Sequence, residues 1–86
     1  MKFIETARFR RAYKSLPQEI KIRVKEALRT LAVNIKYPSL HTKKIKGTRD
    51  IWEARVSLDY RLTFQLIKDY CILRNVGHHD PTLKNP

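Results

Sequence analysis

The chain has 86 residues, of which 42% are hydrophobic, which predicts one compact domain and excludes a disordered chain. Its formal net charge is +11, from 19 Lys and Arg against 8 Asp and Glu. This excess favours a polyanionic partner, which can be nucleic acid, an acidic protein segment or an anionic membrane surface. The alternative is a solvated basic surface without a dedicated partner.

The cysteine count and the apolar runs exclude two further classes of protein. Cys71 is the only cysteine, so an intrachain disulfide and a CxxC zinc site are both excluded. The first residues lack the apolar core of a signal peptide, and no apolar run approaches the length of a membrane span. We therefore expect a cytoplasmic protein without a membrane partner.

The first half of the chain predicts a short strand followed by two amphipathic helices. Residues 2–5 form the strand, and Thr6 is the expected N-cap of a helix with Phe9, Ala12, Tyr13 and Leu16 on one face. Pro17 ends this helix and opens the next one. The apolar stripe of the second helix consists of Ile20, Val24, Ala27, Leu28 and Leu31. The short connection between the helices predicts an antiparallel helical hairpin.

The second half reads as strands. Residues 42–47 predict a short basic strand, and residues 51–56, 60–67 and 70–76 predict an antiparallel meander with tight turns at 57–59 and 68–69. Gly77 is expected to end the last strand. The predicted fold class is α+β in the order β-α-α-β-β-β-β, with an antiparallel-rich twisted sheet covered on one face by the N-terminal helical hairpin. Residues 1–86 are expected to form this single domain.

Polar side chains are predicted to gather on the other face of the sheet. Alternation places Glu53 and Arg55 there, beside Arg61 on the next strand, and the hairpin between them brings the two arginines close together. Two guanidinium groups can clamp a phosphate. Alternatively, Glu53 is their counter-charge in a surface ion-pair ladder. The basic surface that would contact RNA is predicted to include Lys43, Lys44, Lys46, Arg49, Arg74 and His78.

The stretch RNVGHHD, residues 74–80, carries two adjacent histidines near the predicted arginine pair. An imidazole exchanges a proton near neutral pH, which suits a general acid in phosphodiester cleavage. Metal binding is less favoured, because adjacent histidines on an extended chain point in opposite directions and Asp80 is the only nearby third ligand. No metal or other cofactor is predicted. Cys71 lies within a predicted strand and is expected to be a core residue.

The run KIKGTRDIWEARVSLDYRLTFQL, followed after a short gap by LRNVGHHD, resembles the RelE/ParE superfamily of toxins from toxin–antitoxin systems. The resemblance spans nearly the whole chain. Its most specific part is Gly47, then Trp52-Glu53 and Arg55-Val56, with Tyr60-Arg61 following. It implies one of two activities: RelE-like and YafQ-like members are ribosome-dependent mRNA endoribonucleases, and ParE-like members are non-catalytic toxins that bind DNA gyrase. A degenerate member would retain only antitoxin binding.

The resemblance also implies roles for particular residues. In the nucleases a ribose 2′-hydroxyl attacks the adjacent phosphate without a metal ion. Arg61 matches an arginine that stabilises the transition state in the nucleases. Arg55 matches a position that is lysine in some members, and Glu53 matches a position that is basic in RelE. His79 matches an arginine or histidine position of the nucleases, and His41 lies near an acid–base position of the YoeB-like and YafQ-like ones. The terminal tyrosine of RelE has no counterpart here.

The resemblance further implies the partners of the protein. These are a small acidic antitoxin, the ribosome with its mRNA, and operator DNA only through the antitoxin. The position of His79 favours RNA cleavage over the other activities.

Overall fold

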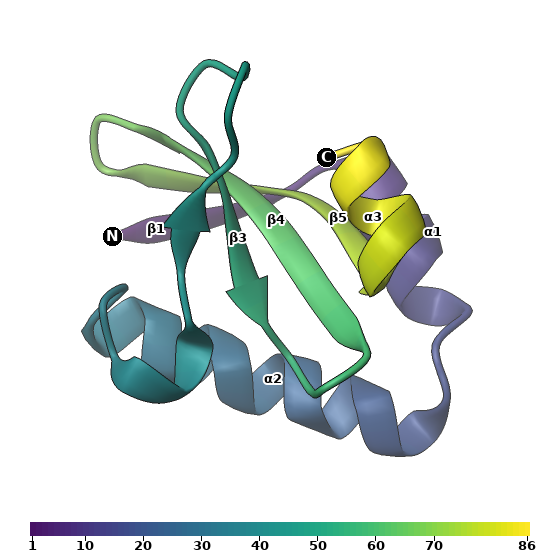
Figure 1. Ribbon diagram of the computed structural model, residues 1–86. Helices are drawn as coiled ribbons and strands as arrows, with labels where there is room; N and C mark the ends of the chain where they lie inside the picture. The colour runs from purple at the N-terminus through teal and green to yellow at the C-terminus, as the bar shows by residue number, and fades with distance from the viewer.

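The computed structural model describes residues 1–86 and confirms the α+β fold class. The elements are β1 (Lys2–Glu5), α1 (Ala7–Lys14), α2 (Gln18–Val33), the 3-10 turn η1 (Pro38–Leu40), β2 (Lys43–Lys44), β3 (Ile51–Arg55), β4 (Tyr60–Ile67), β5 (Tyr70–His78) and α3 (His79–Lys84). Figure 1 shows the helices arranged around one twisted sheet. No helix is long and apolar enough to span a membrane.

The sheet has five strands in the order β1-β5-β4-β3-β2. Strands β2 to β5 pair antiparallel, with the two predicted turns joining β3 to β4 and β4 to β5. Strand β1 pairs with β5 in parallel, with Lys2 opposite Tyr70. The order therefore joins the first and last strands of the sequence and leaves β1 and β2 at the two edges.

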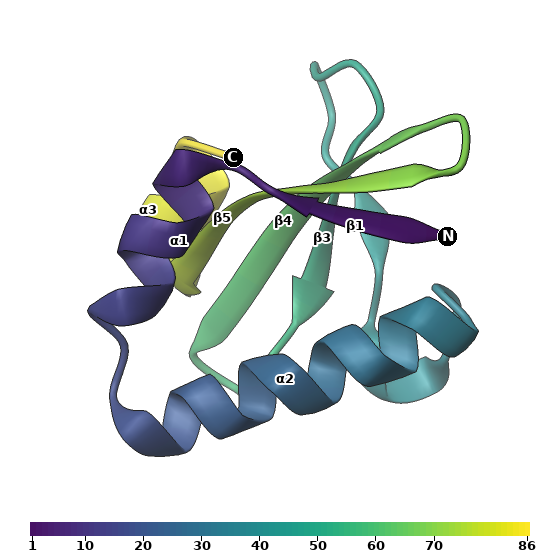
Figure 2. The same ribbon diagram turned by 180° about the vertical axis from the view of Figure 1, so that it is seen from behind.

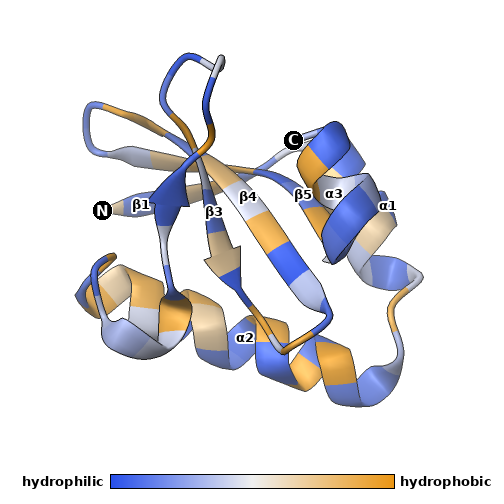
Figure 3. Ribbon diagram, in the orientation of Figure 1, coloured by the Kyte–Doolittle hydropathy of each residue, from blue (hydrophilic) through white to orange (hydrophobic).

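The main core lies between the sheet and the two N-terminal helices. Thr6 caps α1 by accepting a hydrogen bond from the backbone N–H of Phe9, as expected. Phe9 of α1 and the α2 residues Val24 and Leu31 are almost fully buried with the inward side chains of β3, β4 and β5. Figure 3 shows hydrophobic and hydrophilic residues alternating along α2, as its amphipathic sequence predicts. The two helices meet at an angle and do not lie alongside each other as a hairpin (Figures 1 and 2).

Cys71 belongs to this core, as predicted. Its side chain is completely buried, and burial raises the pKa of the thiol to about 12. The thiol is therefore protonated at neutral pH and serves packing.

The other face of the sheet is partly covered, which corrects the expectation that the helices cover only one face. Residues His79–Lys84, for which the sequence predicts no element, form α3, which packs on β4 and β5. Figures 1 and 2 show α1 and α3 on opposite sides of β5. Thr63 is completely buried under this cover, and its hydroxyl donates a hydrogen bond to the carbonyl oxygen of Pro86 at 2.9 Å.

Two strand boundaries also differ from the prediction. The basic strand expected at 42–47 pairs only at Lys43 and Lys44, because the backbone turns at Gly47 (φ 76°) and Asp50 (φ 55°). The last strand continues through Gly77 to His78. Gly77 does not turn the chain there. It allows α3 to approach β5, because a Cβ atom at this position would lie 2.9 Å from the hydroxyl oxygen of Thr82.

Candidate functional site

The sheet register brings most of the predicted catalytic residues to one end of the sheet. Arg61 at the start of β4 lies opposite Arg55 at the end of β3 and, on its other side, opposite Gly77 of β5. His78 ends β5, and the backbone N–H of His79 donates a hydrogen bond to the carbonyl oxygen of Asp59 in the β3–β4 turn at 2.8 Å. We call this end, with its β3–β4 turn and the β5–α3 junction, the histidine end of the sheet.

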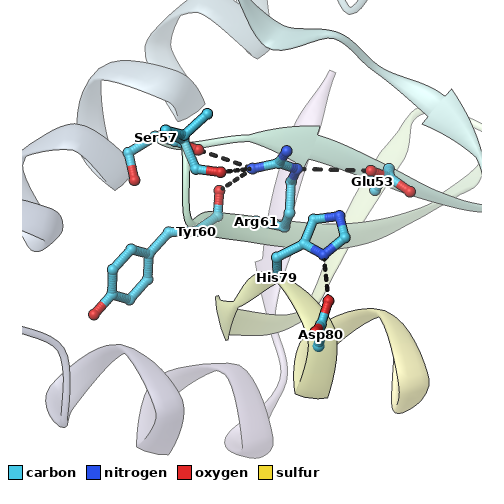
Figure 4. A network of polar contacts seen from close by, with 7 residues as sticks. Glu53, Ser57, Tyr60, Arg61, His79 and Asp80 are labelled. Atoms are coloured by element: carbon cyan, nitrogen blue, oxygen red, sulfur yellow. Dashed lines mark hydrogen bonds and ion pairs between the residues drawn. The ribbon is translucent and has the colours of Figure 1, made fainter.

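Arg61 is buried at the histidine end and is held by the protein itself. Its Nη1 atom donates hydrogen bonds to the carbonyl oxygens of Ser57, Leu58 and Tyr60 at 2.8, 3.1 and 3.0 Å (Figure 4). Its Nε atom lies 3.7 Å from Glu53 Oε1, and both side chains are nearly inaccessible. Arg61 therefore fixes the β3–β4 turn. Nη2 takes part in none of these contacts.

Glu53 is consequently a partner of Arg61 and not an exposed carboxylate. The sequence left open whether the arginines of this face clamp a phosphate or pair with Glu53. The ion pair between Glu53 and Arg61 is present, and Glu53 is only 9% exposed. A buried carboxylate that neutralises a guanidinium is poorly placed to take a proton from a substrate.

Arg55 lies directly across the strand pair from Arg61 but shares none of its partners. It forms no salt bridge, and its Nε atom is the one buried side-chain nitrogen or oxygen without a hydrogen-bond partner. An unpaired buried donor costs about 1–3 kcal/mol. The histidine end thus contains one neutralised guanidinium and one without a counter-charge.

His79 is paired with a carboxylate. Its Nδ1 atom lies 2.7 Å from Asp80 Oδ1, and its side chain is 46% exposed (Figure 4). The hydrogen bond and the charge of His79 lower the pKa of Asp80. The carboxylate occupies Nδ1 and leaves Nε2 of the imidazole available to a substrate.

His78 is paired with a tyrosine. Its Nε2 atom lies 3.2 Å from the hydroxyl oxygen of Tyr60, its partner across β4 and β5, and the two rings are tilted by 31° with centroids 4.4 Å apart. Both histidines line one open depression of about 510 Å³, together with Leu58, Asp59, Asp80 and Pro81. The strand ends at His78 and the helix begins at His79, and each imidazole has a partner of its own.

The remaining predicted residues are distributed along the sheet. His41 follows η1 with a left-handed backbone and precedes β2 on the side of the histidine end, where Lys43 pairs with Glu53. Lys46 and Arg49 lie in the β2–β3 loop at the opposite end (Figure 1), and Lys44 forms an exposed salt bridge with Asp50 at 3.2 Å. Arg74 donates hydrogen bonds to Pro86 and Gln65, so its guanidinium already has partners within the protein.

Two residues of the histidine end were not predicted as functional. Tyr60 was noted only as part of the Tyr60-Arg61 pair, and Asp80 only as a possible third metal ligand. The hairpin register could have placed Tyr60 opposite His78, because the turn at 57–59 and the turn at 68–69 determine the pairing. The sequence offers no comparable signal for the contact between Asp80 and His79.

The fold is shared with toxins of known structure. A YoeB/ParE toxin from Agrobacterium tumefaciens superposes with a TM-score of 0.79 at 13% identity, over 92% of this chain and 99% of that one. The RelB–RelE antitoxin–toxin complex from Methanococcus jannaschii superposes with a TM-score of 0.74 at 26% identity, over 91% of this chain and 89% of that one. YafQ from E. coli strain BL21(DE3) superposes with a TM-score of 0.74 at 17% identity, over 93% of this chain and 94% of that one.

No protein-family model and no curated protein sequence matches the chain. The structural matches extend over more than nine-tenths of its length, and all three are RelE, YoeB or YafQ-type toxins. The resemblance inferred from the sequence is therefore confirmed, and the chain has the fold of the RelE/ParE superfamily of toxins.

Proposed function

We propose that the protein is the toxin of a toxin–antitoxin pair and cuts ribosome-bound mRNA. The observation that carries the proposal is the histidine end of the sheet, where His79 presents a free imidazole nitrogen beside a depression and where Arg55 and Arg61 lie opposite each other on neighbouring strands. The shared fold with RelE, YoeB and YafQ supports the toxin class.

The proposed reaction is transesterification within the RNA chain. The 2′-oxygen of a ribose bonds to the adjacent phosphorus as its proton leaves to a base, and the bond from phosphorus to the 5′-oxygen breaks. His79 Nε2 protonates that 5′-oxygen. The products are a 2′,3′-cyclic phosphate and a free 5′-hydroxyl. Arg55 and the free Nη2 of Arg61 offer positive charge to the phosphate as negative charge develops on it.

The proposed partners follow from charge and from the complexes formed by similar proteins. The net charge of +11 suits both ribosomal RNA and an acidic protein. The M. jannaschii RelE and the E. coli YafQ were each solved in complex with an antitoxin. We propose that a small acidic antitoxin neutralises this protein, and that operator DNA is bound only through the antitoxin. The exposed cations Lys43, Lys44, Lys46 and Arg49 are proposed RNA contacts, and His41 a further contact near the reacting phosphate.

The decisive experiment is primer extension on a defined message incubated with the purified protein, with and without ribosomes. We expect cuts only when ribosomes are present. His79→Gln should lower the cleavage rate by roughly 10²–10⁴-fold, the usual contribution of a general acid. The control is Lys68→Gln, which removes one positive charge from the β4–β5 turn at the far end of the sheet and should leave the rate unchanged.

Intact message in the wild-type reaction would contradict the nuclease assignment. Trapped or inhibited gyrase in a supercoiling assay of the same preparation would then identify the gyrase-directed alternative. Cleavage that is equally fast in His79→Gln would retain the activity and reject the role of His79.

A further inference from the structure

A second hollow borders the β3–β4 turn. Its volume is about 350 Å³, and it is lined by residues of α2, of η1 and of the turn, which lies beside α2 in Figures 1 and 2. Leu58 of the turn is 76% exposed and lines both this hollow and the depression beside His79. The two hollows therefore meet at one side chain. We call the second one the α2–η1 hollow.

The walls of the α2–η1 hollow are fixed by contacts within the chain. Its buried lining is apolar and consists of Ala27 from α2, Leu40 from η1 and Val56 after β3. On the turn side, two carbonyl oxygens of the β3–β4 turn accept hydrogen bonds from the buried Arg61. A ligand therefore meets a hollow that is already formed, which lowers the entropy lost on binding.

The exposed lining of the α2–η1 hollow carries opposite charges that are not paired with each other. Arg23 and Glu26 lie three residues apart on α2, and neither forms a salt bridge. On a helix the favourable order is acidic before basic, and here it is reversed. Thr30, Ser39 and Ser57 add hydroxyl groups. The hollow thus offers a carboxylate that accepts hydrogen bonds and a guanidinium that donates them, above an apolar surface.

We infer that the α2–η1 hollow binds a nucleobase of the message and selects guanine, an inference that rests on the proposed function. An unpaired base is apolar on its faces and carries hydrogen-bond donors and acceptors on its edge, and proteins read it through both. The edge of guanine presents N1–H and the N2 amino group side by side to a carboxylate, here Glu26. Its O6 and N7 atoms accept from a guanidinium, here Arg23.

The same lining disfavours the other polyanionic ligands of a basic protein. The carboxylate of Glu26 repels a phosphate group, and it repels the acidic side chains of an antitoxin equally. The remaining surface supplies the positive charge that holds the RNA backbone, whereas contacts to base edges supply sequence selection. Because the two hollows meet at Leu58, the selected guanine lies close to the cleaved bond in the message.

The first test measures binding without cleavage. The ¹⁵N-labelled protein is titrated with the 5′-monophosphates of guanosine, adenosine, cytidine and uridine, which share one phosphate, so differences between them report the base. We expect the guanosine nucleotide to bind most tightly and to shift the amide signals of residues 26–30 and 57–58. Glu26→Gln should weaken its binding by roughly tenfold, because a good pair of hydrogen bonds to a base edge is lost. The matched control is Glu19→Gln, on the same helix and outside the lining.

Three results would overturn the inference. These are equal affinity for the four nucleotides, amide shifts confined to other parts of the protein, and unchanged binding of the guanosine nucleotide by Glu26→Gln.

The second test measures base selection during cleavage. Messages that differ in a single base beside the cut are incubated with ribosomes and with each protein. We expect the wild type to cut the guanine message fastest and Glu26→Gln to lose roughly tenfold of this preference, while Glu19→Gln keeps it. The same preference in Glu26→Gln as in the wild type would reject the role of the hollow.

The two proposals can fail separately. A protein that binds the guanosine nucleotide at the α2–η1 hollow but leaves ribosome-bound message intact rejects the proposed nuclease and retains the base site. A protein that cuts the message, but with no base preference and no binding at the hollow, rejects only this inference.

Discussion

At the scale of single residues, the histidine end is defined by which nitrogen or oxygen of each side chain already has a partner. The Nδ1 atom of His79 is occupied by Asp80, the Nε2 atom of His78 by Tyr60, and the Nη1 atom of Arg61 by three carbonyl oxygens. The atoms left over are one nitrogen on each imidazole, Nη2 of Arg61 and the guanidinium of Arg55. Of these, Nε2 of His79, Nη2 of Arg61 and the guanidinium of Arg55 are the groups that the proposed cleavage uses.

The pairing of Asp80 with His79 predicts a specific dependence of stability on pH. The pKa of Asp80 lies below its ordinary value of 3.8 in the folded protein, so the folded state favours the carboxylate. The stabilisation is therefore complete above that value and is lost as the pH falls through the lowered pKa. We expect Asp80→Asn to reduce the urea midpoint at about pH 5.5, and we expect this reduction to shrink as the pH falls below 3.8. A reduction of the same size at every pH would show that the carboxylate charge is irrelevant.

At the scale of elements, the β3–β4 turn and α3 both depend on contacts beyond their own residues. The turn is bound by Arg61 from β4, and α3 is a helix of six residues that includes Pro81 and has no apolar stripe. An isolated segment of this length is not helical in water. Its contact with β5, through the buried Thr82, stabilises it. Sequence patterns of local periodicity predicted α1, α2 and the meander, but they contain no signal for such an element.

Removing Arg61 is expected to damage the fold as well as the chemistry. Arg61→Ala leaves Glu53 buried without a counter-charge and frees three carbonyl oxygens of the turn, which should cost roughly 3–5 kcal/mol of unfolding free energy. This differs from the simple expectation of a catalytic residue, whose loss leaves stability unchanged. The measurement is chemical denaturation of Arg61→Ala, Glu53→Gln and the double variant. Strict additivity of the two single effects would contradict a direct interaction between the side chains.

The contact of α3 with β5 can be tested at Gly77. Gly77→Ala places a methyl group 2.9 Å from the position of the Thr82 hydroxyl, and we expect a loss of about 1–3 kcal/mol from overpacking. Thr82→Ala in the same chain removes the clash and should recover part of the loss. Because α3 carries His79, cleavage should fall together with stability in the single variant. A Gly77→Ala protein of unchanged stability would show that α3 does not pack closely here.

At the scale of the whole molecule, the sequence predicted the fold better than it predicted the site. The two turns of the meander determine the pairing of β3, β4 and β5, and this placed Arg55, Arg61 and the histidines at one end. The burial of Glu53 and the partners of Arg74 could not be predicted, because both depend on how the chain returns to the sheet after β5. The parallel pairing of β1 with β5 joins segments that lie far apart in the sequence, so no local sequence pattern predicts it.

That pairing has a consequence for the synthesis of the protein. Residues 2–5 leave the ribosome well before residues 70–73, which are their only neighbours in the sheet. Contacts so distant in sequence form late and slowly in folding. The histidine end itself also requires β5 and α3. Translation must therefore pass α3 before the proposed nuclease can form, so a nascent chain that stops short of this helix is expected to be inactive.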